Sequence, residues 1–174
     1  MEKLCELSGI NKCQIFLPTY YLYKKTMKDN YNACDIWVRF LAIDNYYKKN
    51  NDGFQIYNEV QHYRVNYKKV IPREQYDNEV AFRNLIKSFE TNGFLKEYPL
   101  QLNKDFMVID GAHRLALALY MGIEMVPVCF NEKYYNVDFD YSLQWMIDNG
   151  FGKYKEKLLE QYNRIKEKYE KGQA

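Results

Sequence analysis

Residues 98–130 read YPLQLNKDFMVIDGAHRLALALYMGIEMVPVCF, and this stretch decides the fold. Its first half holds two short apolar runs, Tyr98–Leu102 and Phe106–Ile109, on either side of the polar residues Asn103-Lys104-Asp105. Short apolar runs bounded by turn-forming residues are typical of strands. The sequence therefore predicts two strands joined by a polar turn.

The second half of the stretch predicts a helix and a further strand. A helix is expected from about Ala112 to Met121, and Gly122 follows where a helix commonly ends. The apolar run Met125–Phe130 is short enough for a strand. The chain thus returns to the sheet directly after the helix.

Another helix precedes these strands. Asn78 can cap its start, and Gly93 can end it. Four apolar residues between them recur at helical spacing, namely Phe82, Leu85, Ile86 and Phe89. The order helix, strand, strand, helix, strand predicts a compact α+β unit.

The N-terminal part predicts mainly helix. We expect an extended lead-in from Gln14 to Tyr23, a helix of about four turns from Ile36 to Tyr47, and a shorter helix from Ile56 to Tyr63. Val65 to Ile71 is rich in β-branched and aromatic residues and stops at Pro72, which favours a strand.

The C-terminal part predicts a short helix near Ser142 to Asp148 and a charged helix from about Tyr154 to Glu170. Apolar residues line one face of the second helix, namely Leu158, Leu159, Tyr162, Ile165 and Tyr169. We therefore expect a single domain over residues 1–174, with a core over 66–130 and mostly helical elaborations over 1–65 and 131–174.

The composition argues against several classes of function. Twenty-five Lys and Arg face 23 Asp and Glu, and a net charge of +2 makes DNA binding unlikely. Four cysteines at 5, 13, 34 and 129 lack C-x-x-C spacing, so they predict neither a zinc site nor a disulfide framework. The sequence has no signal peptide and no membrane-spanning stretch, so we expect a cytoplasmic protein.

The turn Asp110-Gly111-Ala112-His113-Arg114 has the composition of an anion site. It joins a strand to a helix, whose first N–H groups and positive end favour phosphate, and Gly111 allows close approach. Arg114 and a protonated His113 can add charged donors, and Asp110 can hold magnesium. From these residues alone, a capped helix with His113 and Arg114 in surface hydrogen bonds is the simpler interpretation.

A longer pattern favours the anion site over a capped helix. The chain contains, in order, Leu85-x-x-Ser88-x-x-x-x-Gly93, Pro99, Asp110-Gly-x-His-Arg114-Leu-Ala, Gly122-Ile and Val126-Pro-Val128. Over roughly residues 70 to 130 this order resembles the ParB/sulfiredoxin superfamily. The resemblance implies a mixed sheet with helices and a site that handles nucleotide phosphates.

The branches of the superfamily differ at the turn. Sulfiredoxins have a nucleophilic cysteine where this chain has Ala112, so the resemblance does not extend to sulfinic acid reduction. Partitioning proteins usually have Gly-Glu-Arg-Arg here and continue into a DNA-binding domain, for which few residues follow Phe130. The Asp-Gly-x-His-Arg form is most similar to that of the free serine kinases.

That resemblance implies a small-molecule kinase that uses magnesium with ATP or ADP, CTP being an alternative nucleotide. The acceptor would be a hydroxyl of an amino acid, sugar or polyol. Glu74 would be the catalytic base, and Asp110 would bind magnesium or assist as base. The nucleotide would contact Gly111, Ala112, His113 and Arg114, with His113 also acting on the transferring phosphoryl group. Glu74 is equally compatible with a solvent-exposed turn residue.

Two other functions remain open. One is a non-enzymatic interaction module in which CTP or ATP binding reorganises the helical flanks. The other, a nuclease, lacks both a basic excess and a carboxylate cluster in the sequence and ranks last. The tyrosines at positions 20, 21, 46, 47 and 57 could shape a pocket for a sugar or base, or pack with wet hydroxyls. The sequence leaves the oligomeric state open.

Overall fold

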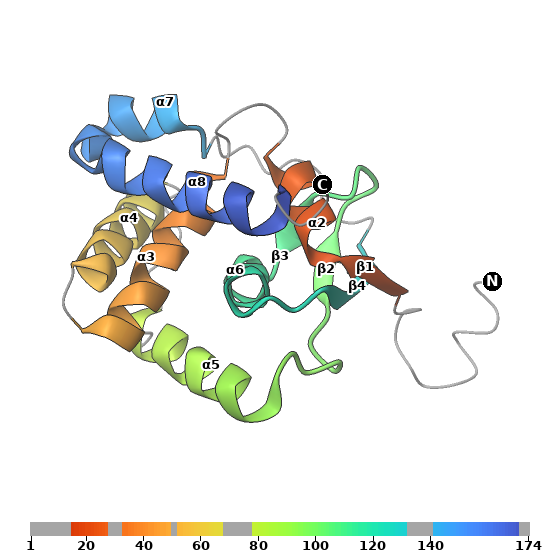
Figure 1. Cartoon of the computed structure of the whole chain (residues 1–174). Helices are drawn as coiled ribbons and strands as arrows, with labels where there is room; N and C mark the ends of the chain where they lie inside the picture. Colours follow the sequence, from red (N-terminus) through yellow and green to blue (C-terminus); the bar gives the residue numbers. More distant parts are fainter. Residues whose placement is uncertain (1–14, 28–32, 50–51, 68–77, 132–140, 171–174) are drawn as a thin grey trace.

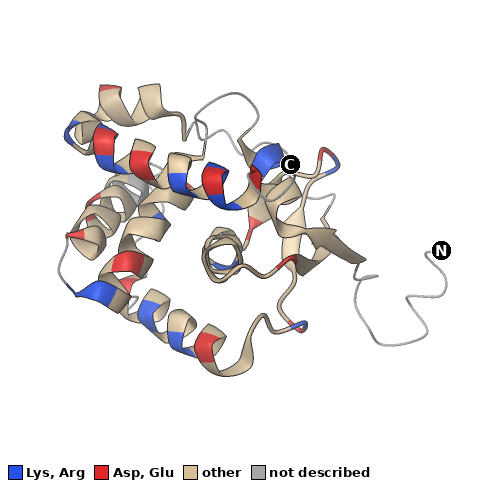
Figure 2. Ribbon diagram, in the orientation of Figure 1, with Lys and Arg blue, Asp and Glu red and all other residues tan. Residues whose placement is uncertain are grey.

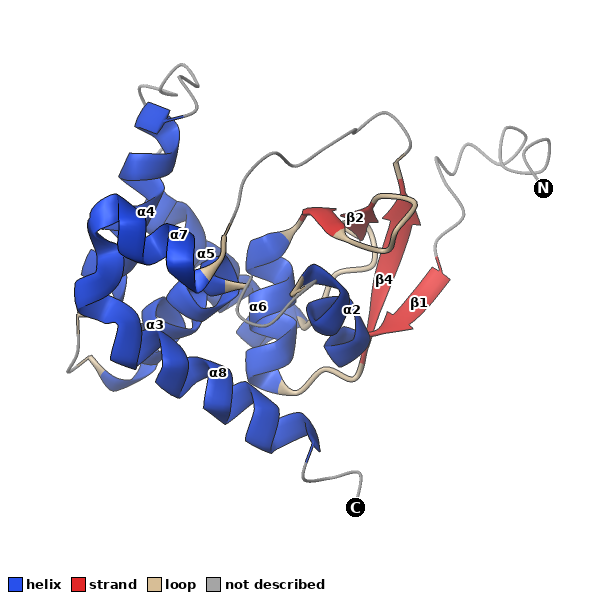
Figure 3. Ribbon diagram, turned by 90° about the horizontal axis from the view of Figure 1, so that it is seen from above, coloured by secondary structure: helices blue, strands red, loops and turns tan. Residues whose placement is uncertain are grey.

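A computed structural model describes five parts of the chain, residues 15–27, 33–49, 52–67, 78–131 and 141–170. The strands gather at one side of the molecule and most helices at the other (Figures 1 and 3). The elements in order are β1 (Ile15–Pro18), α2 (Thr19–Thr26), α3 (Cys34–Lys48), α4 (Gly53–Tyr67), α5 (Asn78–Asn92), β2 (Leu100–Leu102), β3 (Val108–Asp110), α6 (Ala112–Met121), β4 (Met125–Phe130), α7 (Leu143–Met146), the short turns η1 (Ile147–Phe151) and η2 (Gly152–Tyr154), and α8 (Lys155–Glu170). The predicted α+β class is confirmed.

The sheet is mixed and has four strands in the order β1-β4-β2-β3. Strand β2 runs parallel to β4, with Leu100 opposite Val128, and antiparallel to β3, with Gln101 opposite Asp110. Strand β1 lies antiparallel on the other side of β4, where Ile15 also faces Val128. The sheet therefore includes a strand from the N-terminal segment, outside residues 66–130.

Helix α6 occupies the centre of the fold. Figure 1 views it along its axis, with α3, α5 and α8 around it and the sheet on the remaining side. Its residues Leu115 to Leu119 are fully buried, as are Leu100 and Val128 of the sheet. The helix begins at Ala112 and ends before Gly122, as the sequence predicts, and Gly122 adopts a φ of 76°. Such burial supplies most of the stability of a short helix.

Helix α3 forms the core of the helical layer. It packs against α4, α6 and α8, and its residues Cys34 to Asp44 are all buried. Trp37 donates a hydrogen bond of 2.8 Å to the Tyr23 hydroxyl on α2. A Cβ atom at Gly53 would lie 1.9 Å from the Leu41 carbonyl oxygen, so α4 can begin this close to α3 only with glycine there.

A polar cluster links three helices within this layer. The carboxylate of Asp44 on α3 accepts a hydrogen bond of 2.7 Å from the Tyr120 hydroxyl on α6 and another of 2.7 Å from the Arg164 guanidinium on α8. Burial raises the pKa of Asp44, but these hydrogen bonds and the charges of Arg164 and Lys48 together lower it below its usual value. The carboxylate is thus buried in its charged form.

Two predictions for the N-terminal part are wrong in detail. Thr19 to Tyr23 is helical, because the chain turns after Pro18 and the Thr19 N–H donates to the Glu124 carbonyl. Residues Val65 to Tyr67 extend α4 and do not begin a strand. Ile56, Tyr57 and Val60 are buried and anchor that helix. Extending an existing helix costs little free energy, and this outweighs the β preference of residues 65–67. The rest of the predicted strand lies outside the described residues.

The remaining helices agree with the sequence prediction. Helix α5 covers the predicted span and buries Phe82, Ile86 and Phe89. Ser142 caps α7 by accepting a hydrogen bond from the Trp145 N–H, and α8 has Leu158 and Ile165 on its buried face. Acidic and basic residues alternate along α8 in Figure 2. In the part of the chain that the structure describes, no helix is long and apolar enough to cross a membrane.

Candidate functional site

The predicted anion turn lies between β3 and α6. Asp110 ends the strand, and Gly111 adopts a φ of 100° and a ψ of 20° at the start of the helix. A Cβ atom at Gly111 would lie 2.6 Å from Leu100 Cδ2, so both the backbone angle and the packing require glycine. The N-cap residue of α6 is Gly111, which has no side chain to cap the helix. The first-turn N–H groups and the positive end of the helix dipole therefore remain suited to an anion.

Arg114 fastens this turn to the loop before β2. Its Nη1 donates to the carbonyl oxygens of Tyr98 and Pro99, the latter at 2.9 Å, and its Nη2 donates to Asp110 Oδ2 at 3.0 Å. The Arg114 side chain is 18% exposed, whereas that of Asp110 is 60% exposed. The guanidinium thus holds two segments of backbone together, and only part of it faces solvent.

His113 lies against the helical layer. Its Nε2 is 2.8 Å from the Tyr57 hydroxyl on α4, and its ring contacts Phe82 on α5 edge to face at a centroid distance of 4.7 Å. Tyr57 and Phe82 are both almost fully buried. Any contact between His113 and a phosphate would therefore have to use the other ring nitrogen, Nδ1.

A pocket of about 310 Å³ adjoins the turn. We call it the α5 pocket, and its lining residues are Leu85, Ser88, Phe89, Gly93, Leu95, Tyr98 and Arg114. Four of these belong to the pattern that suggested a nucleotide site, namely Leu85, Ser88, Gly93 and Arg114. The fold thus brings separate parts of that pattern to one cavity, with Arg114 shared between the pocket and the turn.

Two lining residues of the α5 pocket were missed by the sequence analysis. Leu95 and Tyr98 lie in the loop between α5 and β2, and Tyr98 is 62% exposed. Large apolar residues in a loop are a recognised sign of a binding surface. The sequence analysis placed Tyr98 at the start of a strand, whereas β2 begins at Leu100, and a loop has no periodicity that would reveal which side it turns inward.

The arrangement suits magnesium only in combination with a ligand. Asp110 uses Oδ2 for Arg114, and Oδ1 has no hydrogen bond within the described residues. In the same residues, no three His, Cys, Asp or Glu side chains gather to form a metal site. Magnesium is commonly bound by one or two carboxylates together with substrate phosphates, and Asp110 fits that mode. The predicted base Glu74 lies outside the described residues.

Three of the five tyrosines singled out in the sequence divide between two roles. Tyr57 is buried and packs against Phe54 and Phe82, so it belongs to the core. Tyr20 and Tyr21 line a second, larger hollow beside α2. The set of tyrosines therefore does not form one pocket.

Comparisons of the chain with protein-family models, with curated proteins and with solved structures found no match. The resemblance to the ParB/sulfiredoxin superfamily thus remains a prediction from the motif. The turn and the pocket beside it are the features of this fold that bear on function.

Proposed function

We propose that the protein is a nucleotide-dependent phosphotransferase that acts on a hydroxyl of a small molecule such as an amino acid, a sugar or a polyol. The observation that carries this proposal is the position of Arg114, which lines the α5 pocket and also belongs to the first turn of α6, where Gly111 is the N-cap residue. A cation at that border suits a ligand with an apolar part and a phosphate part.

In this proposal the phosphates lie at the N–H groups that begin α6, near Gly111 and Ala112. The base lies in the α5 pocket against Leu85, Phe89 and Tyr98, whose ring offers a face for stacking. A cavity of about 310 Å³ is at the lower end of the range for ligand pockets, so it suits a base and leaves the phosphates outside.

Magnesium would neutralise charge on the phosphates, and Asp110 would hold it from the protein side. Transfer further needs a base that takes the proton from the acceptor hydroxyl, which the resemblance assigns to Glu74. Asp110 Oδ1 is the other candidate, because it has no partner within the described residues. The first-turn N–H groups and Arg114 would stabilise the transferring group electrostatically.

Calorimetric titration with ATP, ADP and CTP in the presence of magnesium tests the binding step. Leucine at Ser88 fills the α5 pocket, so Ser88→Leu should abolish or strongly weaken nucleotide binding. Thr91→Leu is the matched control, because Thr91 is exposed on the same helix outside the pocket lining. Absence of binding to all three nucleotides, or equal loss in both variants, would contradict the proposal.

A second experiment tests transfer. The protein is incubated with γ-labelled ATP, or β-labelled ADP, and a panel of amino acids, sugars and polyols, and labelled products are separated from the nucleotide. Glu74→Gln and Asp110→Asn should each abolish labelling while nucleotide binding remains. Labelling that persists in both variants would remove these residues from the catalytic role.

One observation favours a second candidate, a nucleotide-binding module without turnover. The donors of Arg114 already contact the Tyr98 and Pro99 carbonyls and Asp110. Little of the guanidinium charge is therefore left to stabilise the transferring phosphoryl group. Such a module would bind nucleotide and recruit a partner. Binding that is lost in Ser88→Leu, with no transfer to any acceptor on the panel, would support it over the kinase.

A further inference from the structure

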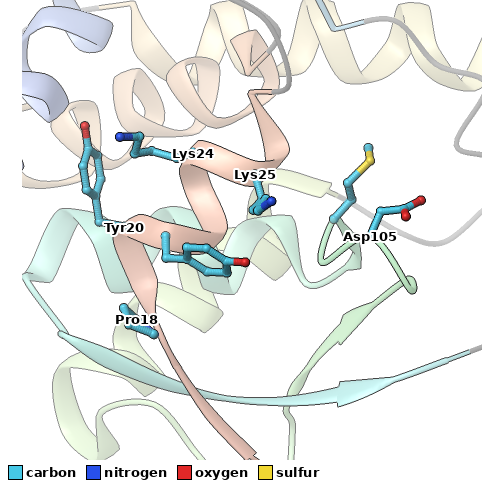
Figure 4. A pocket seen from close by; sticks show the side chains of 7 residues that line it. Pro18, Tyr20, Lys24, Lys25 and Asp105 are labelled. Atoms are coloured by element: carbon cyan, nitrogen blue, oxygen red, sulfur yellow. The ribbon is translucent and has the colours of Figure 1, made fainter.

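A second hollow lies between α2 and the turn that joins β2 to β3, away from the α5 pocket. We call it the α2 groove; it is open to solvent, its volume is about 800 Å³, and its lining residues are Pro18, Tyr20, Tyr21, Lys24, Lys25, Asp105 and Met107. Figure 4 shows Tyr20, Lys24 and Lys25 on α2, with Asp105 on the opposite wall. None of these residues belongs to the site proposed above.

The α2 wall carries two Tyr–Lys pairs with the same spacing. Lys24 lies four residues after Tyr20, and Lys25 lies four residues after Tyr21, so each pair shares one face of the helix. The two ammonium groups lie 5.8 and 5.6 Å from the ring centroids of their tyrosines. Both lysines are exposed, and neither forms an ion pair with any residue that the structure describes.

The opposite wall is preorganised. The Asn103 side-chain oxygen accepts hydrogen bonds from the N–H groups of Asp105 at 3.0 Å and Met107 at 2.9 Å, which fixes the turn. Phe106 between them has a φ of 64°, a left-handed conformation that a bulky residue rarely adopts. Its ring is held between Tyr21 at 6.1 Å and Phe130 at 5.2 Å. Such backbone strain persists only where the surrounding structure enforces it.

We propose that the α2 groove binds an extended acidic peptide segment of a partner protein. The carboxylates of the peptide would pair with Lys24 and Lys25, and its backbone and apolar side chains would lie against Pro18 and Met107. An open hollow of this size suits a chain that passes through it more than an enclosed small molecule.

The same wall disfavours nucleotides and nucleic acids. An ammonium group lies over one face of each tyrosine ring, and Tyr20 also stacks on Tyr169 at 4.9 Å, so a base would have to compete with these groups for the rings. Among the described lining residues, two lysines opposite Asp105 are too few to follow a phosphate backbone. Carboxylates spaced along a peptide fit this charge pattern better.

Fluorescence anisotropy with fluorescein-labelled peptides of alternating Glu and Leu, and of alternating Asp and Phe, tests the proposal. The wild type should bind at least one peptide saturably, and Lys24→Glu with Lys25→Glu should weaken binding by about tenfold or more. Lys155→Glu with Lys166→Glu is the control, because both are exposed lysines on α8 and the charge change is the same. Equal weakening in both double variants, or no binding by the wild type, would overturn the proposal.

A substitution on the opposite wall gives an effect of opposite sign. Asp105→Asn removes the carboxylate from the wall opposite the lysines, so it should strengthen binding of the same peptide, most clearly at low salt. Asp105 is exposed, and the hydrogen bond within the turn uses its backbone N–H, so the turn is retained. Unchanged or weaker binding in Asp105→Asn, or displacement of the peptide by ATP in the Ser88→Leu variant, would overturn the proposal.

Discussion

The turn before α6 and the α2 groove both present positive charge, but they use it differently. At the turn, the Arg114 guanidinium binds two carbonyl oxygens and one carboxylate and is 18% exposed. On α2, the Lys24 and Lys25 ammonium groups contact only tyrosine rings within the described residues and are exposed. The planar fork of arginine suits several fixed acceptors, whereas a lysine remains available to a mobile one. Arg114 stabilises the fold, whereas Lys24 and Lys25 are available to a partner.

This difference affects how the motif is interpreted. Gly111 and Arg114 are both needed by the local structure, because one avoids a clash with Leu100 and the other joins two segments. Their presence is therefore explained by folding even without a ligand. Four experiments measure how much the residues of the turn, of the Asp44 cluster and of the α2 groove contribute to stability, beginning with the largest expected effect.

Gly111→Ala should lower the free energy of unfolding by about 3 kcal/mol, because the backbone strain adds to a clash with Leu100. Gly93→Ala is the control: Gly93 has a φ of 65°, but a Cβ atom there meets nothing within 4 Å. That variant should lose only about 1 kcal/mol. Urea denaturation measures both, and equal losses would mean that the Leu100 contact is not the cause.

Arg114→Ala should lower the free energy of unfolding by about 2 kcal/mol, since it leaves the Tyr98 and Pro99 carbonyls without their donor. Arg114→Lys should recover only part of this loss, because one ammonium cannot reach all three acceptors. The same urea titrations apply. A loss below about 0.5 kcal/mol would mean that Arg114, like the lysines of α2, contributes little to the stability of the fold.

Asp44→Asn tests another arginine that stabilises the fold, Arg164. At neutral pH the loss should be about 1.5 kcal/mol, because the charge-assisted hydrogen bonds from Arg164 and Tyr120 weaken. The folded-state pKa of Asp44 lies below its unfolded value of about 3.9, so its contribution is present above that value and is lost as the pH falls below it. Urea midpoints of both proteins should therefore converge below about pH 4, and a constant difference would contradict this assignment.

Replacing Lys24 and Lys25 together by Ala should change the free energy of unfolding by less than about 0.5 kcal/mol. Their ammonium groups make no ion pair within the described residues, and the exposed cation–π contacts are weak. Thermal unfolding of the double variant measures this. A large loss would mean that these lysines stabilise α2, and that they contribute to the fold as Arg114 does.

The sequence predicted the segment from α5 to β4 well because its signals are local. Asn78, Gly93 and Gly122 mark helix ends, and the strands between them are short and apolar. Pairing of β1 with β4 could not be predicted, since residues more than a hundred positions apart meet there and a four-residue strand has little pattern of its own. The helical state of Val65 was missed because packing of α4 outweighs local preference.

The candidate site was predicted in part. Asp110 to Arg114 are consecutive, so their closeness follows from the chain. Their partners Tyr57, Tyr98 and Pro99 come from other elements, and only the folded structure reveals that these partners bind His113 and Arg114. The α2 groove depends on the approach of a helix to a turn far along the chain, which no local pattern indicates.

Helix α6 is held at both ends. Arg114 ties its start to the loop before β2, while at its far end Lys168 donates to the Leu119 and Tyr120 carbonyls and Tyr169 donates to Leu119 at 2.7 Å. A helix fixed in this way cannot slide along its axis when a ligand arrives. If a nucleotide binds at the turn as proposed, its association should therefore follow a single exponential whose rate rises linearly with ligand concentration, without a slow step of rearrangement.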